Sequence, residues 1–311
     1  MKTKVYIDGQ SGTTGLQIYD RIGQREDIEL LKIDPEKRHD PEERARFINS
    51  ADVVFLCLPD AEAKVAVSLC TNPDTCIIDA STAHRTNDDW AYGFPEISSA
   101  QREKIKNSKR IANPGCHATG FISTVYPLVN MGILPADYPV TCYSLTGYSG
   151  GGKKMIASYE EEDRDIKLSA PCIYGLSLKH KHIPEMTKIT GLKNAPGFIP
   201  VVDDYYKGMA TTVLLTNSLL NGAPTAQEIC DRLKEYYKDE HFVTVRDFNA
   251  DAKSIYANEL AGTNKLEIIV SGNEEHTAVT ALFDNLGKGA SGAAVQNMNI
   301  VLGIDEATGL E

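Results

Sequence analysis

The chain has 311 residues, of which 42% are hydrophobic and 24% are charged, a composition that excludes a disordered chain, a collagen-like fibre and a small disulfide scaffold. Its 43 acidic residues outnumber the 32 lysines and arginines and give a formal net charge of −11, which argues against nucleic acid or an anionic membrane as a partner. The longest apolar run, residues 53–58, is far shorter than a membrane-spanning helix, and no signal-peptide core follows the N-terminus, so we expect a cytoplasmic protein.

The first 115 residues alternate strand-like and helix-like segments, which is typical of a parallel sheet with crossover helices. Strands are predicted at residues 4–8, 28–33, 53–58 and 76–79, and helices at residues 14–22 and 61–70. The strand at 53–58 is apolar at every position, as expected for a strand buried on both faces. Asp60 is predicted to cap the helix that follows it.

After Cys116 the pattern changes. Apolar residues at helical spacing predict a helix over residues 118–129, which Pro127 should kink or end early. Strands with few helices between them follow at residues 140–145, 209–215, 242–245, 266–270 and 277–283. One helix is predicted among them at residues 225–238, and residues 290–302 have helical spacing again. This mixture predicts an α+β domain with a largely antiparallel sheet.

A glycine-rich loop lies between the first predicted strand and the first predicted helix. Its residues are Gly9, Gln10, Ser11, Gly12, Thr13, Thr14 and Gly15. Glycines permit a tight turn and a close backbone approach, and the helix N-terminus offers free N–H groups to a pyrophosphate. An ordinary glycine-rich turn is the alternative, but the strand before and the helix after favour dinucleotide binding. We therefore expect an α/β protein with a Rossmann-like domain over residues 1–115, completed by a C-terminal helix within 286–311, and a second, α+β domain over 116–285.

The residues after the second strand bear on the choice between NAD and NADP. Asp34 stands where an acidic residue would bind the ribose hydroxyls of NAD, yet Lys37 and Arg38 follow at once and would pair with a 2′-phosphate. Charged loop residues are often only solvated, so these side chains favour NADP slightly.

Cys116 differs from the other cysteines. The seven are odd in number, widely spaced and without a Cys-x-x-Cys pair, so neither a disulfide framework nor a cysteine-rich zinc site is expected. Most are predicted to be reduced core residues, but Cys116 stands at a predicted helix start, where the helix dipole favours the thiolate. It is therefore either a nucleophile or one more buried cysteine.

A partner base for the thiolate is offered by His180 and His182. Glu185 follows three residues later and would orient an imidazole if the chain turns helically at Pro184. Surface histidines and a metal site of two histidines and one glutamate are the alternatives. The metal reading is weaker because no clear ligand geometry results, and no metal is expected.

Two further segments suit anion binding. Ser149 and Gly150 begin a flexible loop followed by Lys153, a composition that can hold a phosphate or a carboxylate. Arg85 follows the strand that ends at Asp79 and so emerges at the carboxyl edge of the sheet, where doubly wound folds bind ligands. It would hold a substrate carboxylate or merely cap a neighbouring helix.

Taken together and in order, these motifs resemble those of the N-acetyl-γ-glutamyl-phosphate reductases of arginine biosynthesis, the shorter branch of a family within the semialdehyde dehydrogenase superfamily. The resemblance runs from the Gly9 loop through Asn-Pro-Gly-Cys to the glycine-rich residues 285–297. It implies that Cys116 is the nucleophile, that the acid/base histidine is His180 or, because of Glu185, His182, and that Asn285 contacts the nicotinamide of NADP. Lys153 departs from the family pattern, in which arginine is expected after the glycines.

The resemblance further implies NADPH-dependent reductive dephosphorylation of N-acetyl-L-γ-glutamyl phosphate to the semialdehyde, through a thioester on Cys116. The partners expected are the small-molecule substrate, phosphate and further copies of the chain, because strands of the second domain could pair across a two-fold axis. An aspartate-semialdehyde dehydrogenase is the nearest alternative. A cysteine–histidine hydrolase and a non-enzymatic NADP-binding protein are alternatives from other classes.

Overall fold

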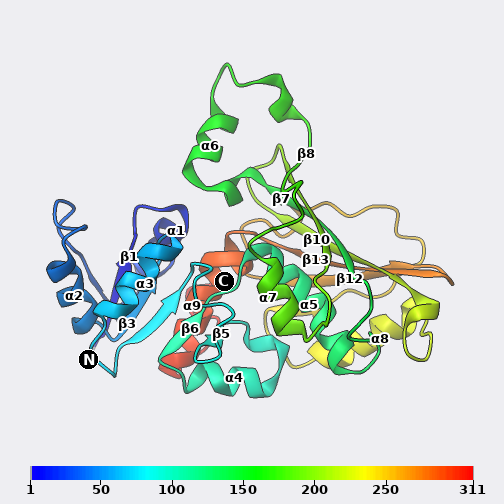
Figure 1. Cartoon of the computed structure of the whole chain (residues 1–311), viewed down its shortest axis with the longest axis horizontal. Helices are drawn as coiled ribbons and strands as arrows, with labels where there is room; N and C mark the ends of the chain where they lie inside the picture. Colours follow the sequence, from blue (N-terminus) through cyan, green and yellow to red (C-terminus); the bar gives the residue numbers. More distant parts are fainter. Residues whose placement is uncertain (1, 311) are drawn as a thin grey trace. The chain divides into compact units, whose positions relative to one another are not determined.

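The computed structural model describes residues 2–310, and their contacts divide the chain into two compact units. Unit 1 takes the residues up to Pro114 together with those from Ala290 onward, and unit 2 takes Gly115–Gly289 (Figure 1). The sequence predicted domain boundaries at residues 115 and 286, and the contacts divide the chain after Pro114 and after Gly289.

Unit 1 is built on a six-stranded parallel sheet in the order β2-β1-β3-β4-β6-β5. The strands are β1 (Thr3–Asp8), β2 (Ile28–Leu31), β3 (Val53–Leu56), β4 (Cys76–Asp79), β5 (Ala91–Tyr92) and β6 (Arg110–Ala112). Because β2 lies on one side of β1 and β3 on the other, the strand order reverses at β1, and such a reversal marks the ligand-binding crevice of doubly wound sheets.

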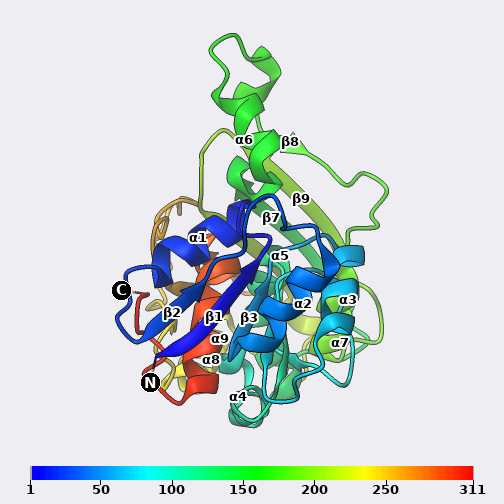
Figure 2. The same cartoon turned by 90° about the vertical axis from the view of Figure 1, so that its left-hand side faces the viewer.

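Five helices accompany this sheet in the described part of unit 1: α1 (Thr13–Ile22), α2 (Pro41–Ser50), α3 (Asp60–Leu69), α4 (Ser99–Lys106) and α9 (Gly292–Leu302). α1 packs with α9, and α2 packs with α3 (Figure 2). Buried apolar side chains fill the space between α2, α3 and the sheet, among them Tyr6, Ile48, Val54 and Ile77. The C-terminal helix therefore completes the same unit as the glycine loop.

The start of α3 differs from the prediction. Asp60 does not cap this helix, because it is the first helical residue and follows Pro59 in the capping position. Its carboxylate instead accepts hydrogen bonds from the backbone N–H of Thr82, at 2.9 Å, and from the Thr82 hydroxyl. Asp60 still lies in the first turn of α3, where a negative charge interacts favourably with the helix dipole. Its bonds to Thr82 also hold the loop after β4 in place.

Unit 2 contains a seven-stranded sheet in the order β11-β12-β13-β10-β7-β9-β8. The strands are β7 (Thr141–Gly147), β8 (Cys172–Ile173), β9 (Gly197–Asp203), β10 (Met209–Thr216), β11 (Val243–Val245), β12 (Leu266–Gly272) and β13 (His276–Phe283). Neighbouring strands are antiparallel except in the β11–β12 and β7–β9 pairs. The expected fold class, a doubly wound parallel sheet with a second α+β domain of largely antiparallel strands, is confirmed.

The helices of unit 2 are α5 (Cys116–Asn130), α6 (Gly152–Glu160), α7 (Ile183–Thr190) and α8 (Ala226–Tyr237). α8 begins with a capping box between Thr225 and Glu228, at the predicted position. Figures 1 and 2 show that the segment with α6 and β8 projects beyond the rest of this unit. Within residues 2–310, the structure has no helix long and apolar enough to cross a membrane.

Of the two effects expected of Pro127, a kink or an early end of the helix, the early end is wrong, because α5 continues to Asn130. Proline lacks an N–H, so the carbonyl of Ser123, four residues earlier, loses its helical partner. The Tyr237 hydroxyl of α8 donates to that carbonyl at 2.8 Å and replaces the lost bond. A tertiary contact therefore stabilises a helix that the local sequence disfavours.

Candidate active site

Cys116 is the first residue of α5. The capping residue, Gly115, has extended backbone angles and supplies no side chain, so the N–H groups of the first helical turn lie beside the cysteine. Cys116 is partly exposed, as is Cys57, whereas Cys76 is buried. Desolvation raises the pKa of the Cys57 and Cys76 thiols to about 12. Those two thiols stay protonated and unreactive near neutral pH, which sets Cys116 apart from them.

The chain approaches Cys116 closely at Gly289. A β-carbon added at Gly289 would lie 3.1 Å from the Cys116 Cβ and at a similar distance from the Phe283 ring. Only glycine leaves this space open, so the residues after β13 fix one side of the cysteine.

Glu185 of α7 contacts the backbone that leads into the cysteine. The helical turn that the sequence required at Pro184 is present, since α7 begins at Ile183 with His182 as its capping residue. The Glu185 carboxylate is buried, and its Oε2 accepts a hydrogen bond from the Gly115 N–H at 3.3 Å. Glu185 thus links the start of α7 to the start of α5.

His180 and His182 lie together, with ring centroids 4.7 Å apart. His182 is buried, and its backbone N–H donates to His180 Nδ1 at 3.2 Å. Burial, reinforced by the Lys181 charge, lowers the pKa of His180 to about 4, so this imidazole is neutral near pH 7. Among residues 2–310 no group of three or more histidine, cysteine or acidic side chains has the arrangement of a metal site.

His117 is a site residue that the sequence reasoning missed. Its ring lies 5.7 Å from His182 and 5.5 Å from His180 between centroids, and it is buried. Its position directly after Cys116 was the available signal. The Tyr174 hydroxyl, which bonds to His117 Nε2 at 2.7 Å, had no signal in the sequence.

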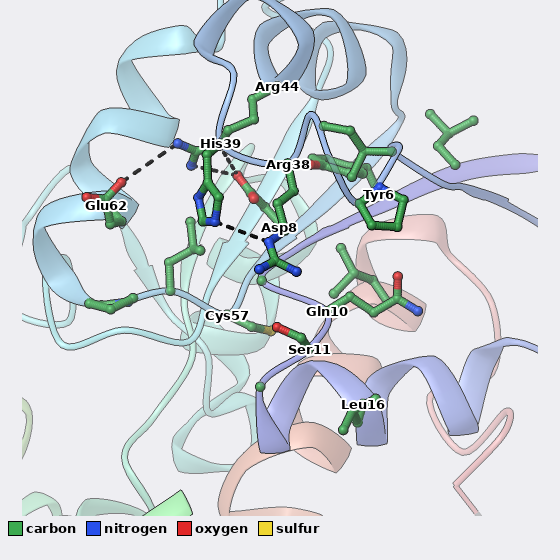
Figure 3. A pocket seen from close by; sticks show the side chains of 18 residues that line it. Tyr6, Asp8, Gln10, Ser11, Leu16, Arg38, His39, Arg44, Cys57 and Glu62 are labelled. Atoms are coloured by element: carbon green, nitrogen blue, oxygen red, sulfur yellow. Dashed lines mark hydrogen bonds and ion pairs between the residues drawn. The ribbon is translucent and has the colours of Figure 1, made fainter. Parts of the chain in front are cut away.

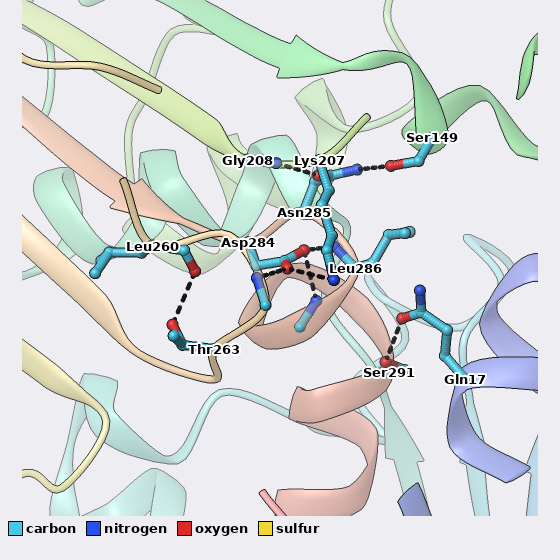
Figure 4. Close-up of polar contacts among 12 residues, drawn as sticks. Gln17, Ser149, Lys207, Gly208, Leu260, Thr263, Asp284, Asn285, Leu286 and Ser291 are labelled. Atoms are coloured by element: carbon cyan, nitrogen blue, oxygen red, sulfur yellow. Dashed lines mark hydrogen bonds and ion pairs between the residues drawn. The ribbon is translucent and has the colours of Figure 1, made fainter. Parts of the chain in front are cut away.

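Ser149, Gly150 and Asn285 lie together at a second place in unit 2. Asn285 is buried; its Nδ2 donates to Ser149 Oγ at 3.0 Å and its Oδ1 accepts from the Gly208 N–H at 2.9 Å (Figure 4). A β-carbon on Gly150 would lie 3.4 Å from the Asn285 amide nitrogen. Lys153, by contrast, is exposed near the start of α6.

In unit 1 the glycine loop joins β1 to α1. Gly9 has a left-handed φ of 87°, and a β-carbon there would lie 2.3 Å from the Cys57 carbonyl oxygen. A β-carbon on Gly15 would lie 2.6 Å from the Gly9 oxygen, so both positions require glycine. The first residues of α1 are Thr13 and Thr14. Gly12, the capping residue, has no side chain to bond the N–H groups of the first turn, so these groups remain available to a ligand.

A pocket of about 900 Å³ opens beside this loop (Figure 3). It is lined by Gly9, Ser11 and Gly12 and also by Arg38, His39 and Arg44, but not by Lys37 or Asp34. The Arg44 guanidinium is held by the buried Asp8 carboxylate at 2.8 Å and lies 3.8 Å from Glu62. Arg38 donates its Nε to His39 at 3.1 Å. Because acidic partners already balance Arg44, the charge of Arg38 is the more available to an anionic ligand.

Arg85 is buried in unit 1. Its Nε donates to the Asn113 carbonyl at 2.9 Å, and its Nη2 donates to the Ala80 carbonyl at 3.0 Å. These bonds connect the loop after β4 to the residues that precede unit 2. The strand-end rule correctly placed Arg85 at the carboxyl edge of the sheet but gave no sign of these backbone contacts.

Comparisons with known proteins agree with this arrangement. Residues 9–108 match the model of the semialdehyde dehydrogenase NAD binding domain, and residues 116–285 match that of the semialdehyde dehydrogenase dimerisation domain. N-acetyl-gamma-glutamyl-phosphate reductase 2 of Nostoc sp. is 46% identical over 99% of both chains. The N-acetyl-gamma-glutamyl-phosphate reductase of Brucella ovis is 46% identical over 97% of this chain and 100% of its own.

Solved structures support the fold alone, because their sequence identity is low. Aspartate semialdehyde dehydrogenase from Francisella tularensis matches with a TM-score of 0.73 at 15% identity, over 96% of this chain and 100% of the other. The Candida albicans enzyme, solved with NADP, matches with a TM-score of 0.68 at 15% identity, over 97% and 99%. From the family models and the relatives at 46% identity, the chain belongs to the semialdehyde dehydrogenase family and, within it, to the N-acetyl-γ-glutamyl-phosphate reductases.

Proposed function

We propose that the chain reduces N-acetyl-L-γ-glutamyl phosphate with NADPH, yielding N-acetyl-L-glutamate 5-semialdehyde and phosphate in arginine biosynthesis. The observation that carries this proposal is Cys116, a partly exposed thiol at the uncapped start of α5, beside Glu185 and the histidines that lead into α7. The relatives that carry the reductase name support the choice of substrate.

In the proposed reaction the Cys116 thiolate attacks the γ-acyl carbon. A carbon–sulfur bond forms, the bond from that carbon to the phosphate oxygen breaks, and phosphate leaves. NADPH, when bound, supplies the hydride that reduces the resulting thioester. His182 gives a proton to the oxygen on this carbon as negative charge develops, and takes it back as the carbon–sulfur bond breaks to release the aldehyde. The one proton consumed overall leaves on hydrogen phosphate.

Unit 1 is proposed to hold NADP, and unit 2 to carry the reacting groups, in line with the domains expected at 1–115 and 116–285. Gly9, Ser11 and Gly12 line a pocket wide enough for an adenosine, and the uncapped start of α1 at Thr13 and Thr14 suits a pyrophosphate. Asn285 remains the proposed nicotinamide contact. For the substrate, the proposed contacts are Arg85, Ser149, Gly150 and Lys153.

The experiment that tests this function is reduction of NADP by N-acetylglutamate semialdehyde, followed through NADPH absorbance with and without phosphate. We expect a rate that requires phosphate, and a much lower rate with aspartate semialdehyde. Preference for aspartate semialdehyde would favour the alternative dehydrogenase. Thioester hydrolysis without coenzyme turnover would instead favour a hydrolase, and coenzyme binding without either reaction a binding protein.

Coenzyme choice gives a testable prediction. Arg38→Ala should weaken NADPH binding much more than NADH binding, because a charge-assisted contact to the 2′-phosphate is lost while the glycine loop is unchanged. Lys37→Ala is the matched control and should have the smaller effect, since Lys37 does not line the pocket. Dissociation constants from fluorescence titration decide the matter, and an equal loss for both coenzymes would remove Arg38 from the 2′-phosphate contact.

The chain is proposed to act as a homo-oligomer in the cytoplasm, with small molecules and without nucleic acid or membranes as partners. The family model that matches unit 2 is described as a dimerisation domain. On the sheet face opposite α5, Tyr143 of β7, Ile199 of β9 and Leu214 of β10 are 43%, 43% and 53% exposed. Tyr143 is in register with Ile199. An apolar sheet face of this kind is suited to a second copy of the same face.

Placing charges on this face should therefore separate the copies. Tyr143→Glu combined with Leu214→Glu should give monomers in light scattering after size-exclusion chromatography, because the desolvation of two carboxylates opposes association. Leu219→Glu is the control, since Leu219 is 56% exposed in the turn after β10 rather than in the sheet. An unchanged mass for the double variant, with a native circular dichroism spectrum, would exclude this face as the interface.

A further inference from the structure

Four polar side chains form a continuous hydrogen-bonded series that runs through His117, the residue directly after Cys116. Thr211 Oγ1 and Ser144 Oγ are 2.8 Å apart, Ser144 Oγ and His117 Nδ1 are 2.8 Å apart, and His117 Nε2 and the Tyr174 hydroxyl are 2.7 Å apart. We name these residues the relay. The first three are buried, while Tyr174 is partly exposed.

The sheet and α5 hold the relay in place. Thr211 of β10 and Ser144 of β7 are paired in register, so their side chains lie next to each other on the face that α5 covers. A β-carbon on Gly120 would lie 2.4 Å from Thr211 Oγ1, so glycine is what allows α5 to pack this closely. His117 therefore sits between a rigid sheet and Tyr174, one residue after Cys116.

The imidazole of His117 is neutral near pH 7. Burial, aided by the nearby His180 and Lys181, lowers the pKa of His117 to about 3. A neutral imidazole has one nitrogen that donates and one that accepts. The three hydroxyls and this imidazole therefore bring four protons to the three hydrogen bonds of the relay, and one proton must be donated outside it.

The surplus proton belongs to Thr211, Ser144 or Tyr174, because the proton of the neutral imidazole always lies in one of the two His117 bonds. Thr211 and Ser144 are fully buried, and within the described chain their hydroxyls bond only to each other and, for Ser144, to His117. A buried hydroxyl proton left without an acceptor is unfavourable, so Thr211 donates to Ser144 and Ser144 donates to His117 Nδ1. His117 then carries its proton on Nε2 and donates it to the Tyr174 oxygen. The Tyr174 O–H is left to donate outside the relay, at the partly exposed end.

We propose that Tyr174 donates a hydrogen bond to the acyl oxygen of the substrate bound at Cys116, and that His117 is the positioning residue that aims this donor. The inference rests on the proposed reductase function. Burial and the negative charge of the Cys116 thiolate raise the pKa of Tyr174, so the phenol keeps its proton and acts as a donor rather than as an acid.

This donor has a task that His182 does not perform. Negative charge develops on the acyl oxygen when the thiolate attacks and again when hydride is added, and a donor already fixed in direction stabilises that charge at both stages. His182 moves a proton to and from the same oxygen, whereas Tyr174 retains its own. The relay would thus let the sheet hold a donor whose direction does not depend on the substrate.

The first test replaces Tyr174 by phenylalanine, which keeps the ring and deletes the donor. With N-acetylglutamate semialdehyde, phosphate and NADP, kcat should fall about 10²–10³-fold, as for other single oxyanion donors. The rate of Cys116 alkylation by iodoacetamide should change little, because that reaction forms no oxyanion on an acyl oxygen. Tyr138→Phe, which removes another buried phenol oxygen of unit 2, is the control and should keep kcat.

The second test concerns the orientation of the Tyr174 O–H, which the relay is proposed to fix. Ser144→Ala removes the hydroxyl that fixes the His117 tautomer, and kcat should fall between about twofold and tenfold, the equivalent of one hydrogen bond. Combined with Tyr174→Phe it should cause no further loss, because the relay acts through the phenol. Ser123→Ala is the matched control, since within residues 2–310 that buried hydroxyl bonds only to the Gly120 carbonyl of α5. Nitrogen NMR of labelled histidine should show the His117 proton on Nε2.

Each contrary result has a distinct meaning. If the wild type is active and Tyr174→Phe has the same kcat, the inference is overturned. A proton found on Nδ1 of His117 would overturn it as well. Parallel losses of kcat and of alkylation rate in Tyr174→Phe would show that Tyr174 only shapes the site. Absence of wild-type activity would overturn the proposed function and this inference with it.

Discussion

Cys116→Ala should abolish turnover, with kcat reduced by several orders of magnitude, while the protein folds and binds NADPH as the wild type does. No thioester can form without the thiol, and the residual rate has to come from binding and positioning alone. Coenzyme binding should persist because the glycine loop and its pocket belong to unit 1. The measurements are steady-state kinetics in both directions and NADPH titration by fluorescence.

Alkylation identifies the same thiol without a mutation. At neutral pH iodoacetamide should label Cys116 rapidly and leave Cys57 and Cys76 unlabelled, because burial raises the pKa of both to about 12. Cys172 is exposed on β8, so its labelling serves as an internal control that substrate should not protect. Cys172→Ala should keep full activity. Substantial phosphate-dependent turnover by Cys116→Ala would refute the covalent mechanism.

The parts of the fold that the sequence predicted depend on local patterns. The fully apolar strand β3, the glycine loop before α1 and the helix α8 all follow from neighbouring residues. α2 was missed because its exposed surface is charged and its buried residues are only Arg44 and Ile48, so no apolar stripe marks it. Its start is nevertheless capped by Asp40, a signal that was present in the sequence.

The site was predictable only as far as residue types reveal chemistry. Cysteine, histidine and glycine at Cys116, His182 and Gly9 indicate function by themselves, whereas Tyr174 gains its place through a tertiary contact with His117. The continuation of α5 past Pro127 was unpredictable for the same reason, because the Tyr237 hydroxyl that stabilises the helix lies more than a hundred residues along the chain. Hydrophobic periodicity indicates which face of a helix or strand is buried, but it does not indicate which residue from a distant part of the chain contacts that face.

His182→Asn should lower kcat by about 10²–10⁴-fold, the usual contribution of a positioned acid/base group, and should leave NADPH binding unchanged. Thioester formation should be less affected than release of the aldehyde, so rapid mixing with the acyl phosphate should still trap some acyl-enzyme. His180→Asn is the matched comparison, because His180 is two residues away and its ring lies 4.7 Å from that of His182.

The two histidines should differ in the pH dependence of kcat as well as in its size. Burial lowers the pKa of His180 to about 4, so between pH 6 and 9 this ring stays neutral and has no proton to release as an imidazolium acid. Its Nδ1 accepts the backbone N–H of His182, so His180→Asn should act by loosening the other ring and cost less, with the pH profile of the wild type retained. A larger loss with His180→Asn, or a shifted profile in that variant alone, would instead assign the acid/base role to His180.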